Sequence, residues 1–307
     1  MIIVNYELFA NFAVDQNEET MKHRHLFIYI VTFLLTLSTV KAAQPSPYTL
    51  EDSLLVEHLL RESKNKHLSV GQTMLHFARA LKGIPYVGHT LDRTDDERMV
   101  INLHELDCTT YVESVLALTH CAQTGKNQFR DYAKTLQTIR YRQGKLSYEN
   151  RLHYFEWWAD DNAEKHLVEI VDTPRPPFLG AQKLKINFMS TNYQSYDMLR
   201  NHPERVRALK VLEDQTNGKC VRYIPKANIK NTPLLRQIVH DGDIIGIVTS
   251  KKNLDTTHLG IAVWHKDGLH MLHASSVHKK VIEDSTPLYL YLKKQPASLG
   301  IRIVRPL

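Results

Sequence analysis

Hydrophobic residues recur every three or four positions in several early segments, which is the spacing of an amphipathic helix. Leucines follow this pattern over residues 49–63. Ser69-Val-Gly-Gln72 matches a capping box, in which the serine and glutamine side chains satisfy backbone N–H groups at a helix start. A further apolar stripe begins near Asp107 or Cys108 and reaches about Cys121. The sequence therefore predicts three helices before residue 125.

The pattern changes to short apolar runs in the C-terminal part of the chain. Runs separated by turn residues are typical of short strands, and four of them lie at 243–248, 258–264, 269–273 and 301–304. Helices that come first and strands that come later predict an α+β fold, with the N-terminal helices packed on a largely antiparallel sheet. Residues 121–235 give mixed signals, and we expect them to form a long middle insertion.

One long apolar run, residues 26–40, lies near the N-terminus. A basic stretch precedes it and small residues follow it, which together predict a signal peptide over residues 21–42. The run is short for a membrane span, which needs about 20 apolar residues, but an uncleaved anchor stays open as the alternative. Signal peptides rarely begin with an acidic segment, so we interpret residues 1–20 as an upstream extension and Met21 as the start.

Export would leave residues 43–307, which contain no repeat or linker-like tract and are expected to form a single domain. The sequence therefore predicts a secreted or periplasmic protein without a stable membrane anchor after signal cleavage. In such an oxidising compartment, Cys121 and Cys220 either form a disulfide, which leaves Cys108 free, or remain buried thiols. The sequence does not decide between these two arrangements.

The amino-acid composition excludes several classes of protein. Hydrophobic residues make up 43% of the 307 residues and charged residues 23%, which supplies enough apolar surface for a core and excludes a disordered chain. Three cysteines are too few for a disulfide scaffold. The net charge of +6 is compatible with anionic ligands but too small to indicate a nucleic-acid partner. We expect a monomer that binds no nucleic acid.

Cys108 is the candidate nucleophile, because it lies where a polar loop meets a predicted helix. Unpaired N–H groups at a helix start favour an anion, so we expect this thiol to ionise more readily than a free cysteine, whose pKa is about 8.5. The same N–H groups would hold the oxyanion of an acyl intermediate. The alternative is a small buried residue, as most free cysteines are. Asp107 fits both interpretations, because it can simply cap the helix.

Two histidines on the predicted C-terminal strands are the candidate bases. His258 begins one strand and His273 ends the next. If the strands are neighbours, His258 can take the proton from Cys108 while His273 holds the other imidazole nitrogen, as in a catalytic triad. A single histidine at a strand edge is more often structural, so it is the pair, in this order after the cysteine, that favours catalysis.

Five motifs follow one another in the order found in the NlpC-type papain-like cell-wall peptidases. They are Gly83-Ile-Pro-Tyr-Val, Asp107-Cys108, Gly242-Asp243, His258-Leu-Gly-Ile-Ala and His273-Ala-Ser. The chain most closely resembles the N-acetylmuramoyl-L-alanine amidase-like branch, first described as a family of unknown function. The segments similar to that branch are Leu103-His-Glu-Leu-Asp-Cys-Thr-Thr-Tyr-Val-Glu113, Arg140-Tyr-Arg-Gln-Gly144 and Arg151-Leu-His-Tyr-Phe155.

The resemblance implies a papain-like NlpC-type fold and a triad that matches Cys108, His258 and His273. It implies that Tyr86 lies near the thiol and helps to bind the oxyanion or to orient the site. The implied activity is that of an N-acetylmuramoyl-L-alanine amidase acting on peptidoglycan-derived muropeptides, anhydro-muropeptides above all. Neither a metal nor an organic cofactor is expected. The middle region 121–235 would then be the part that recognises the substrate. Asp107 is a further candidate for binding the oxyanion or the substrate.

Two alternatives remain. Thr109 and Thr110 stand where the wider superfamily usually has Ser-Gly, which counts against its commoner activity, cleavage of the stem peptide between D-glutamate and a diamino acid. That endopeptidase activity is the first alternative. A cell-wall-binding module without catalysis is the second, and the three filled triad positions count against it.

Aromatic and basic residues between 148 and 161 suggest a muropeptide-binding wall. Arg151, Tyr154 and Trp157 are the candidates, because aromatic faces stack on sugar rings and arginine pairs with carboxylates. The helical spacing of Tyr154 and Trp157 fits a helix core equally well. A second wall over 187–196 rests on polarity alone.

Five histidines between residues 258 and 278 raise the question of a metal site, since imidazole is a common zinc ligand. Neither a helix-borne His-Glu-x-x-His pattern nor paired Cys-x-x-Cys is present. On alternating strands these histidines would split between the two faces of the sheet, so we expect no metal.

Overall fold

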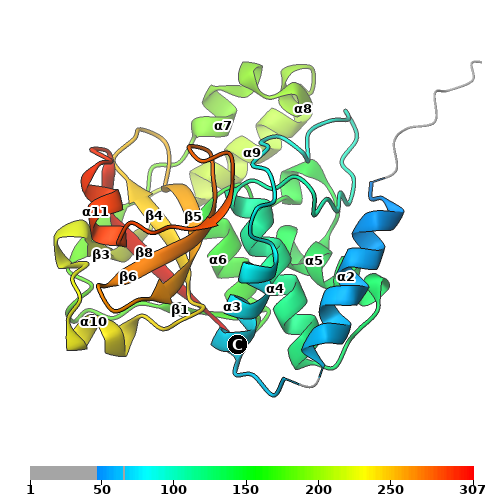
Figure 1. Cartoon of the computed structure of the whole chain (residues 1–307). Helices are drawn as coiled ribbons and strands as arrows, with labels where there is room; N and C mark the ends of the chain where they lie inside the picture. Colours follow the sequence, from blue (N-terminus) through cyan, green and yellow to red (C-terminus); the bar gives the residue numbers. More distant parts are fainter. Residues whose placement is uncertain (1–46, 65) are drawn as a thin grey trace, which may run out of the picture. The chain divides into compact units, whose positions relative to one another are not determined.

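The computed structural model describes residues 47–64 and 66–307, and this part of the chain contains ten α-helices and eight strands (Figure 1). The α-helices are α2 (Leu50–Ser63), α3 (Val70–Ala80), α4 (Cys108–Gln123), α5 (Phe129–Arg140), α6 (Phe155–Glu164), α7 (Phe188–Thr191), α8 (Asp197–Arg200), α9 (Pro203–Thr216), α10 (Pro233–Ile238) and α11 (Leu288–Lys293). The strands are β1 (Val168–Val171), β2 (Gly180–Lys183), β3 (Cys220–Pro225), β4 (Ile244–Thr249), β5 (Thr256–Trp264), β6 (Leu269–Ser275), β7 (Lys280–Glu283) and β8 (Ser298–Pro306). The predicted α+β class is confirmed.

The three predicted N-terminal helices begin at capping boxes. Thr49, Ser69 and Asp107 each accept a hydrogen bond from the backbone N–H three residues further on, and the side chain at that third position bonds back to the cap. This reciprocal arrangement satisfies N–H groups that a helix start otherwise leaves unpaired. Because the signal is local in sequence, the helix starts could be predicted to within a residue.

One antiparallel sheet holds all eight strands. Its order is β2-β3-β8-β4-β5-β6-β7, and β1 also pairs with β8. β5 and β6 form a hairpin with Ile261 opposite Leu272. This register puts His258 and His273 on the same face of the hairpin, since side chains alternate along a strand. The two strands that carry His258 and His273 are therefore adjacent, as the triad hypothesis requires.

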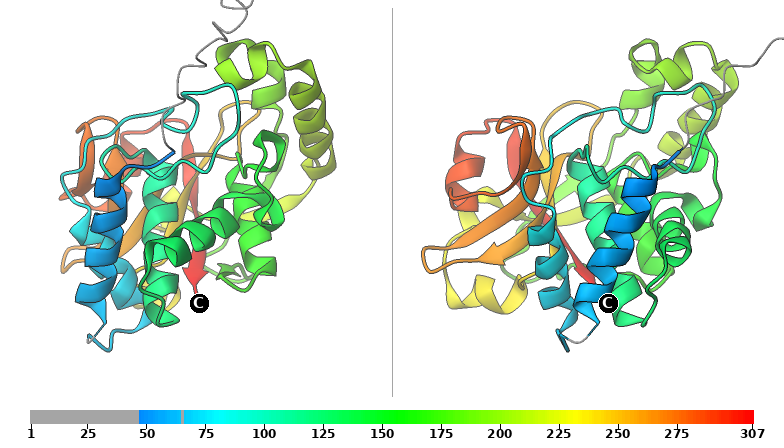
Figure 2. Two further views of the ribbon diagram at one scale, coloured as in Figure 1. Left: turned by 90° about the vertical axis from the view of Figure 1, so that its right-hand side faces the viewer. Right: turned by 45° about the vertical axis from the view of Figure 1, so that its right-hand side comes forward.

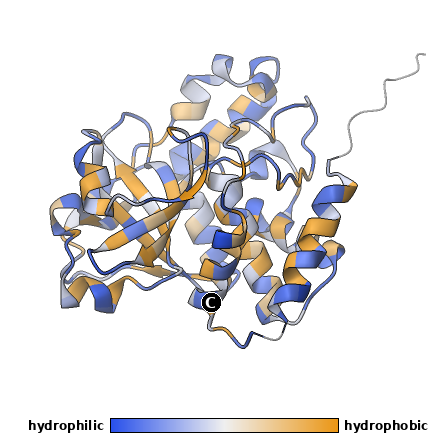
Figure 3. Ribbon diagram, viewed as in Figure 1, coloured by the Kyte–Doolittle hydropathy of each residue, from blue (hydrophilic) through white to orange (hydrophobic). Residues whose placement is uncertain are grey.

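Each face of the sheet carries its own hydrophobic core. Alternate residues of one strand serve different cores, so that Ile244 packs with the N-terminal helices and Ile245 packs on the opposite face. The helices α2 to α6 lie on one side of the sheet, whereas the short helices α10 and α11 lie on the other (Figures 1 and 2). Hydrophobic residues accordingly dominate the central strands (Figure 3).

Residues 47–307 form one compact unit. The middle region 121–235 supplies α5, α6 and three strands of the common sheet, so it is built into this unit more deeply than an insertion would be. The predicted extension 1–20 and the predicted signal peptide 21–42 lie outside the described residues. Among the helices that are described, none combines the length and apolar character needed to cross a membrane.

Candidate active site

Cys108 is the first residue of α4 and is partly exposed. The preceding residue, Asp107, is the N-cap: its Oδ1 accepts hydrogen bonds from the backbone N–H of Thr109 at 3.0 Å and of Thr110 at 2.8 Å. Asp107 therefore caps the helix, and its carboxylate is engaged by these two hydrogen bonds. The N–H groups of Thr109 and Thr110 therefore already have an acceptor in Asp107. Of the backbone donors expected at the helix start, only the N–H of Cys108 remains to bind an oxyanion.

The pKa of the Cys108 thiol is higher than its position at a helix start led us to expect. Burial and the neighbouring Asp107 carboxylate raise the pKa of the thiol to about 11, although hydrogen bonds from the Leu259 backbone and the Thr109 side chain act in the other direction. The helix start was expected to lower this pKa, and that expectation is wrong for the free enzyme, because loss of water around the sulfur outweighs the hydrogen bonds. The resting Cys108 side chain is a neutral thiol.

His258 and His273 meet across the β5–β6 hairpin. The Nε2 of His258 lies 2.6 Å from the Nδ1 of His273, and their rings are almost perpendicular. The Nε2 of His273 lies 3.6 Å from Oδ2 of Asp284, which follows β7. Since Nε2 of His258 is engaged by His273, its Nδ1 is the nitrogen left to serve a substrate or a thiol.

Both imidazoles are neutral in this setting. Burial lowers the pKa of His258 to about 3, with the nearby His273 acting in the same direction. Burial likewise lowers the pKa of His273 to about 4, although Asp284 raises it in part. The thiol of Cys108 and the imidazole of His258 are thus both uncharged, and His258 is able to accept a proton.

Cys108 and His258 line the same pocket, which has a volume of about 140 Å³. Its walls come from the start of α4, from the loop that leads into α6 and from the first half of β5; they comprise Cys108, Thr109, Leu152, His153, Tyr154, Phe155, Trp158, Leu254, Asp255, Thr256, Thr257, His258 and Leu259. Asp255 joins two of these walls, because its Oδ2 accepts a hydrogen bond from the backbone N–H of Glu156 at 2.7 Å. The candidate nucleophile and base therefore share one concave site.

Tyr86 is half-buried and lies close enough to Cys108 and Asp107 for their charges to affect it. Burial raises the pKa of its hydroxyl, and Cys108 when ionised and the Asp107 carboxylate raise it further. A backbone bridge between Tyr86 and Leu106 ties this tyrosine to the loop before the cysteine. A neutral hydroxyl beside the thiol is able to donate a hydrogen bond to an oxyanion.

The three candidates for the binding wall have their polar groups engaged inside the protein. Arg151 pairs with Asp92 at 2.7 Å and with Glu97 at 2.6 Å. Tyr154 donates to Oε1 of Glu213 at 2.6 Å, and Trp157 donates to Oγ1 of Thr216 at 2.7 Å; these contacts make the three side chains part of the core. Tyr154 belongs to the pocket lining, but Arg151 and Trp157 do not.

His153 is a pocket residue that the sequence did not single out. Its Nε2 lies 2.8 Å from the backbone carbonyl of Tyr148, so Nε2 carries the proton and donates, and Nδ1 is left as an acceptor. Burial and the Arg151 charge lower the pKa of His153 to about 3, which keeps the ring neutral. Its place inside the motif Arg151-Leu-His-Tyr-Phe155 was the available signal.

All three cysteines are free thiols in this structure. Cys121 is buried in α4, where its sulfur contacts Oγ1 of Thr135 at 3.6 Å, whereas Cys220 is exposed on β3. The two cysteines are therefore unpaired, but the expectation of a buried thiol is correct only for Cys121 and wrong for Cys220.

Solved structures of similar sequence give the class of this protein. An N-acetylmuramoyl-L-alanine amidase from Bacteroides uniformis is 38% identical, with 78% of this chain and 99% of that chain covered and a TM-score of 0.72. A structure from Bacteroides fragilis that is provisionally named a xylanase is 39% identical, with 74% and 98% covered and a TM-score of 0.69. A Legionella pneumophila protein of the DUF1460 family, 23% identical, has the same fold with a TM-score of 0.64 over 84% of this chain and 95% of that one.

The fold and the sequence thus define an enzyme of the amidase class. The model of the AmiA-like family, described as N-acetylmuramoyl-L-alanine amidase-like, matches residues 76–301, and the chain belongs to this family. No curated protein matches it.

Proposed function

We propose that the protein is a cysteine-dependent N-acetylmuramoyl-L-alanine amidase that acts on peptidoglycan fragments. The observation that carries the proposal is the shared pocket, in which Cys108 at a helix start faces the same space as His258, while His258 is bonded to His273. Membership of the amidase-like family supports the reaction class. The bond cleaved is the amide between the lactyl group of N-acetylmuramic or 1,6-anhydro-muramic acid and L-alanine.

The reaction begins from a neutral thiol and a neutral imidazole. As the sulfur of Cys108 attacks the lactyl carbonyl carbon, its proton passes to Nδ1 of His258, and the carbonyl oxygen becomes an oxyanion held by the N–H of Cys108 and the hydroxyl of Tyr86. The C–N bond then breaks and the L-alanine nitrogen takes the proton from His258. Water, deprotonated by His258, attacks the thioester and releases the muramic acid carboxylate with the regenerated thiol.

His273 keeps the base in position for both proton transfers. Its Nδ1 shares one proton with Nε2 of His258 over 2.6 Å, which fixes the orientation of the His258 ring. The imidazolium formed during attack is stabilised by the same contact and, through His273, by Asp284. His153 offers a neutral acceptor in the pocket for an amide N–H or hydroxyl of the muropeptide.

The products of a defined digest test the bond assignment. With a 1,6-anhydro-muropeptide as substrate, mass spectrometry should find an intact stem peptide that begins with a free L-alanine amine, together with the free sugar. Release of the diamino acid, with L-Ala-D-Glu still on the sugar, would instead establish the stem-peptide endopeptidase. Binding of the fragment without any product would establish a binding module. The Cys108→Ala protein serves as the blank.

The pH dependence should reflect the low pKa of His258. Protonation of His258 removes the proton acceptor, and burial holds its pKa at about 3, so kcat/KM should not fall as the pH drops through 6.5, the ordinary imidazole value. The measurement is a pH–rate profile on the anhydro-muropeptide, with activity re-measured at pH 7 after each acid exposure to detect unfolding. An acid limb centred near 6.5 would contradict the buried, neutral base.

We propose further that the enzyme works outside the cytoplasm, in a periplasmic or extracellular space, as a monomer. The support is the apolar run at 26–40 with its basic and small-residue flanks. N-terminal sequencing of the protein recovered from the exported fraction should give a start at or near Ala43. A start within residues 1–20 would show that no signal peptide is removed.

A further inference from the structure

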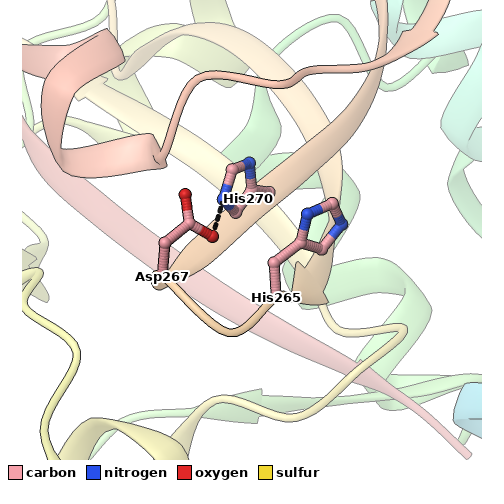
Figure 4. A group of neighbouring side chains, drawn as sticks. All are labelled: His265, Asp267 and His270. Atoms are coloured by element: carbon pink, nitrogen blue, oxygen red, sulfur yellow. Dashed lines mark hydrogen bonds and ion pairs between the residues drawn. The ribbon is translucent and has the colours of Figure 1, made fainter.

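The tip of the β5–β6 hairpin brings together two histidines and an aspartate that the amidase mechanism does not use. His265, Asp267 and His270 each offer one ligand atom, and these atoms all lie within 4.8 Å of one another (Figure 4). Counting alternate positions along strands led us to expect the histidines to split between faces. That expectation is wrong for His265 and His270, because the turn between them reverses the chain and stacks the rings with centroids 4.1 Å apart.

His270 is held in the manner of a metal ligand. Its side chain is 1% exposed, and its Nδ1 lies 2.8 Å from the backbone carbonyl of Asp284, so Nδ1 carries a proton and donates. Its Nε2 lies 2.9 Å from Oδ1 of Asp267. A neutral ring would therefore turn a lone pair toward a carboxylate oxygen, which is repulsive. Either a second proton or a cation must lie between the Asp267 carboxylate and this nitrogen.

His265 has a matching outer partner. Its Nε2 lies 2.9 Å from Oε1 of Glu283, and Glu283 is itself fixed by two hydrogen bonds from Arg79. Histidines that bind metals usually donate their other ring N–H to a carboxylate or a backbone carbonyl, which fixes the tautomer and raises the basicity of the ligating nitrogen. Glu283 does this for His265, as the Asp284 carbonyl does for His270, so both rings are provided with the acceptors that such sites use.

We propose that His265, Asp267 and His270 bind a divalent transition-metal ion of borderline softness, such as Zn²⁺, through Nδ1 of His265, Oδ1 of Asp267 and Nε2 of His270. Zinc accepts this combination of nitrogen and oxygen ligands at about 2.0–2.2 Å, with water in the fourth position. Tetrahedral bonds of this length put two ligand atoms roughly 3.3–3.6 Å apart, so atoms now up to 4.8 Å apart must approach by a movement of roughly 1 Å. His265, whose side chain is 37% exposed, supplies it by tilting its ring.

The ion would act on the β5–β6 hairpin and not on the substrate. The turn joins β5, which carries His258, to β6, which carries His273, so an ion at the turn fixes the hairpin on which both catalytic imidazoles stand. The site is separate from the pocket, because its three residues are not among those that line it. The proposal therefore does not depend on the proposed function.

Equilibrium dialysis of the full chain against Zn²⁺ at pH 7.5 tests the site. Wild type should bind one ion per chain, and Asp267→Asn and His265→Gln should each weaken binding by at least about tenfold. His58→Gln, which removes an exposed histidine on α2, is the matched control and should bind as wild type does. Both test positions are at the surface, so the variants should fold even where the buried His270→Ala does not.

Substitution with Co²⁺ reports on the ligands directly. Wild type should develop visible absorption bands of low coordination number, and Asp267→Asn and His265→Gln should lose them. Bound Zn²⁺ should also raise the melting temperature of wild type, since an ion that binds the folded chain stabilises it. Absence of Zn²⁺ binding by wild type, or equal binding by the two test variants, would show that Asp267 and His270 form an ordinary ion pair and would overturn the proposal.

Discussion

Cys108→Ala is expected to reduce kcat/KM for anhydro-muropeptide cleavage by a factor on the order of 10⁴–10⁶, because removal of a nucleophile that works with a base abolishes the covalent route. The thiol is the one sulfur in the pocket, so no neighbouring cysteine within the described part of the chain can replace it. The measurement is release of the stem peptide, followed by chromatography at matched enzyme concentrations. Iodoacetamide should inactivate the wild-type enzyme, because alkylation blocks the sulfur of Cys108.

The control for this loss is Cys220→Ser, which removes an exposed thiol on β3 and should retain wild-type activity. His258→Ala should cost about as much as Cys108→Ala, and the double variant should cost little more than either, because residues that act as one unit give strongly non-additive effects. Unchanged peptide release by Cys108→Ala would remove cysteine catalysis altogether. Additive losses in the double variant would mean that Cys108 and His258 act in separate steps.

Local signals made the helix starts predictable. The capping boxes at Ser69 and Asp107 involve residues only three positions apart, so the sequence contains the whole interaction. The order of Cys108, His258 and His273, with two apolar strands around the histidines, was enough to predict one site once the strands were taken as neighbours. The secondary-structure elements that carry these three residues could therefore be predicted from the sequence alone.

The side chains of the binding wall could not be assigned in the same way. Helical spacing puts Tyr154 and Trp157 near one another, but whether they face solvent depends on Glu213 and Thr216, each 59 residues away. Arg151 likewise finds Asp92 and Glu97 across more than 50 residues. These partners turn a set of apparent sugar-binding residues into core contacts, and no local pattern contains them.

The pKa of the Cys108 thiol could not be predicted from local sequence either. The N-terminus of α4 lowers a thiol pKa, and the sequence contains that helix. It does not contain the burial of the sulfur, which is the largest effect and acts in the opposite direction. Asp107, which the sequence identifies as a cap, also supplies a negative charge beside the sulfur. A prediction based on the helix alone therefore gave the wrong direction.

A buried ion pair links α4, which carries Cys108, to α5 and should contribute strongly to stability. Glu113 of α4 and Arg140 at the end of α5 lie 2.7 Å apart, and both side chains are 3% exposed. Arg140 also donates to the carbonyl of Val100 at 2.6 Å. Arg140→Met should lower the free energy of unfolding at pH 7 by about 3–5 kcal/mol, because it leaves a buried carboxylate without its cation. Urea denaturation followed by circular dichroism measures this change.

The pH dependence of that loss follows from the pKa of Glu113. Burial raises this pKa above its ordinary value of 4.5 even with Arg140 present, and removal of the arginine raises it further, since the Arg140 charge acts to lower it. A group whose folded pKa is raised destabilises the folded state while it is ionised, and this cost vanishes as the pH falls below the unfolded pKa. The stability difference between Arg140→Met and wild type should therefore shrink as the pH is lowered from 7 toward 4.5.

Two variants separate the buried charge from the lost packing. Glu113→Gln combined with Arg140→Met should recover much of the stability, because replacement of both partners removes the uncompensated charge. Lys210→Met breaks an exposed pair with Asp214 of similar distance, 2.6 Å, and should cost no more than about 1 kcal/mol. If Arg140→Met costs no more than Lys210→Met, or if its cost is the same at every pH, the Glu113–Arg140 pair does not hold α4 against α5.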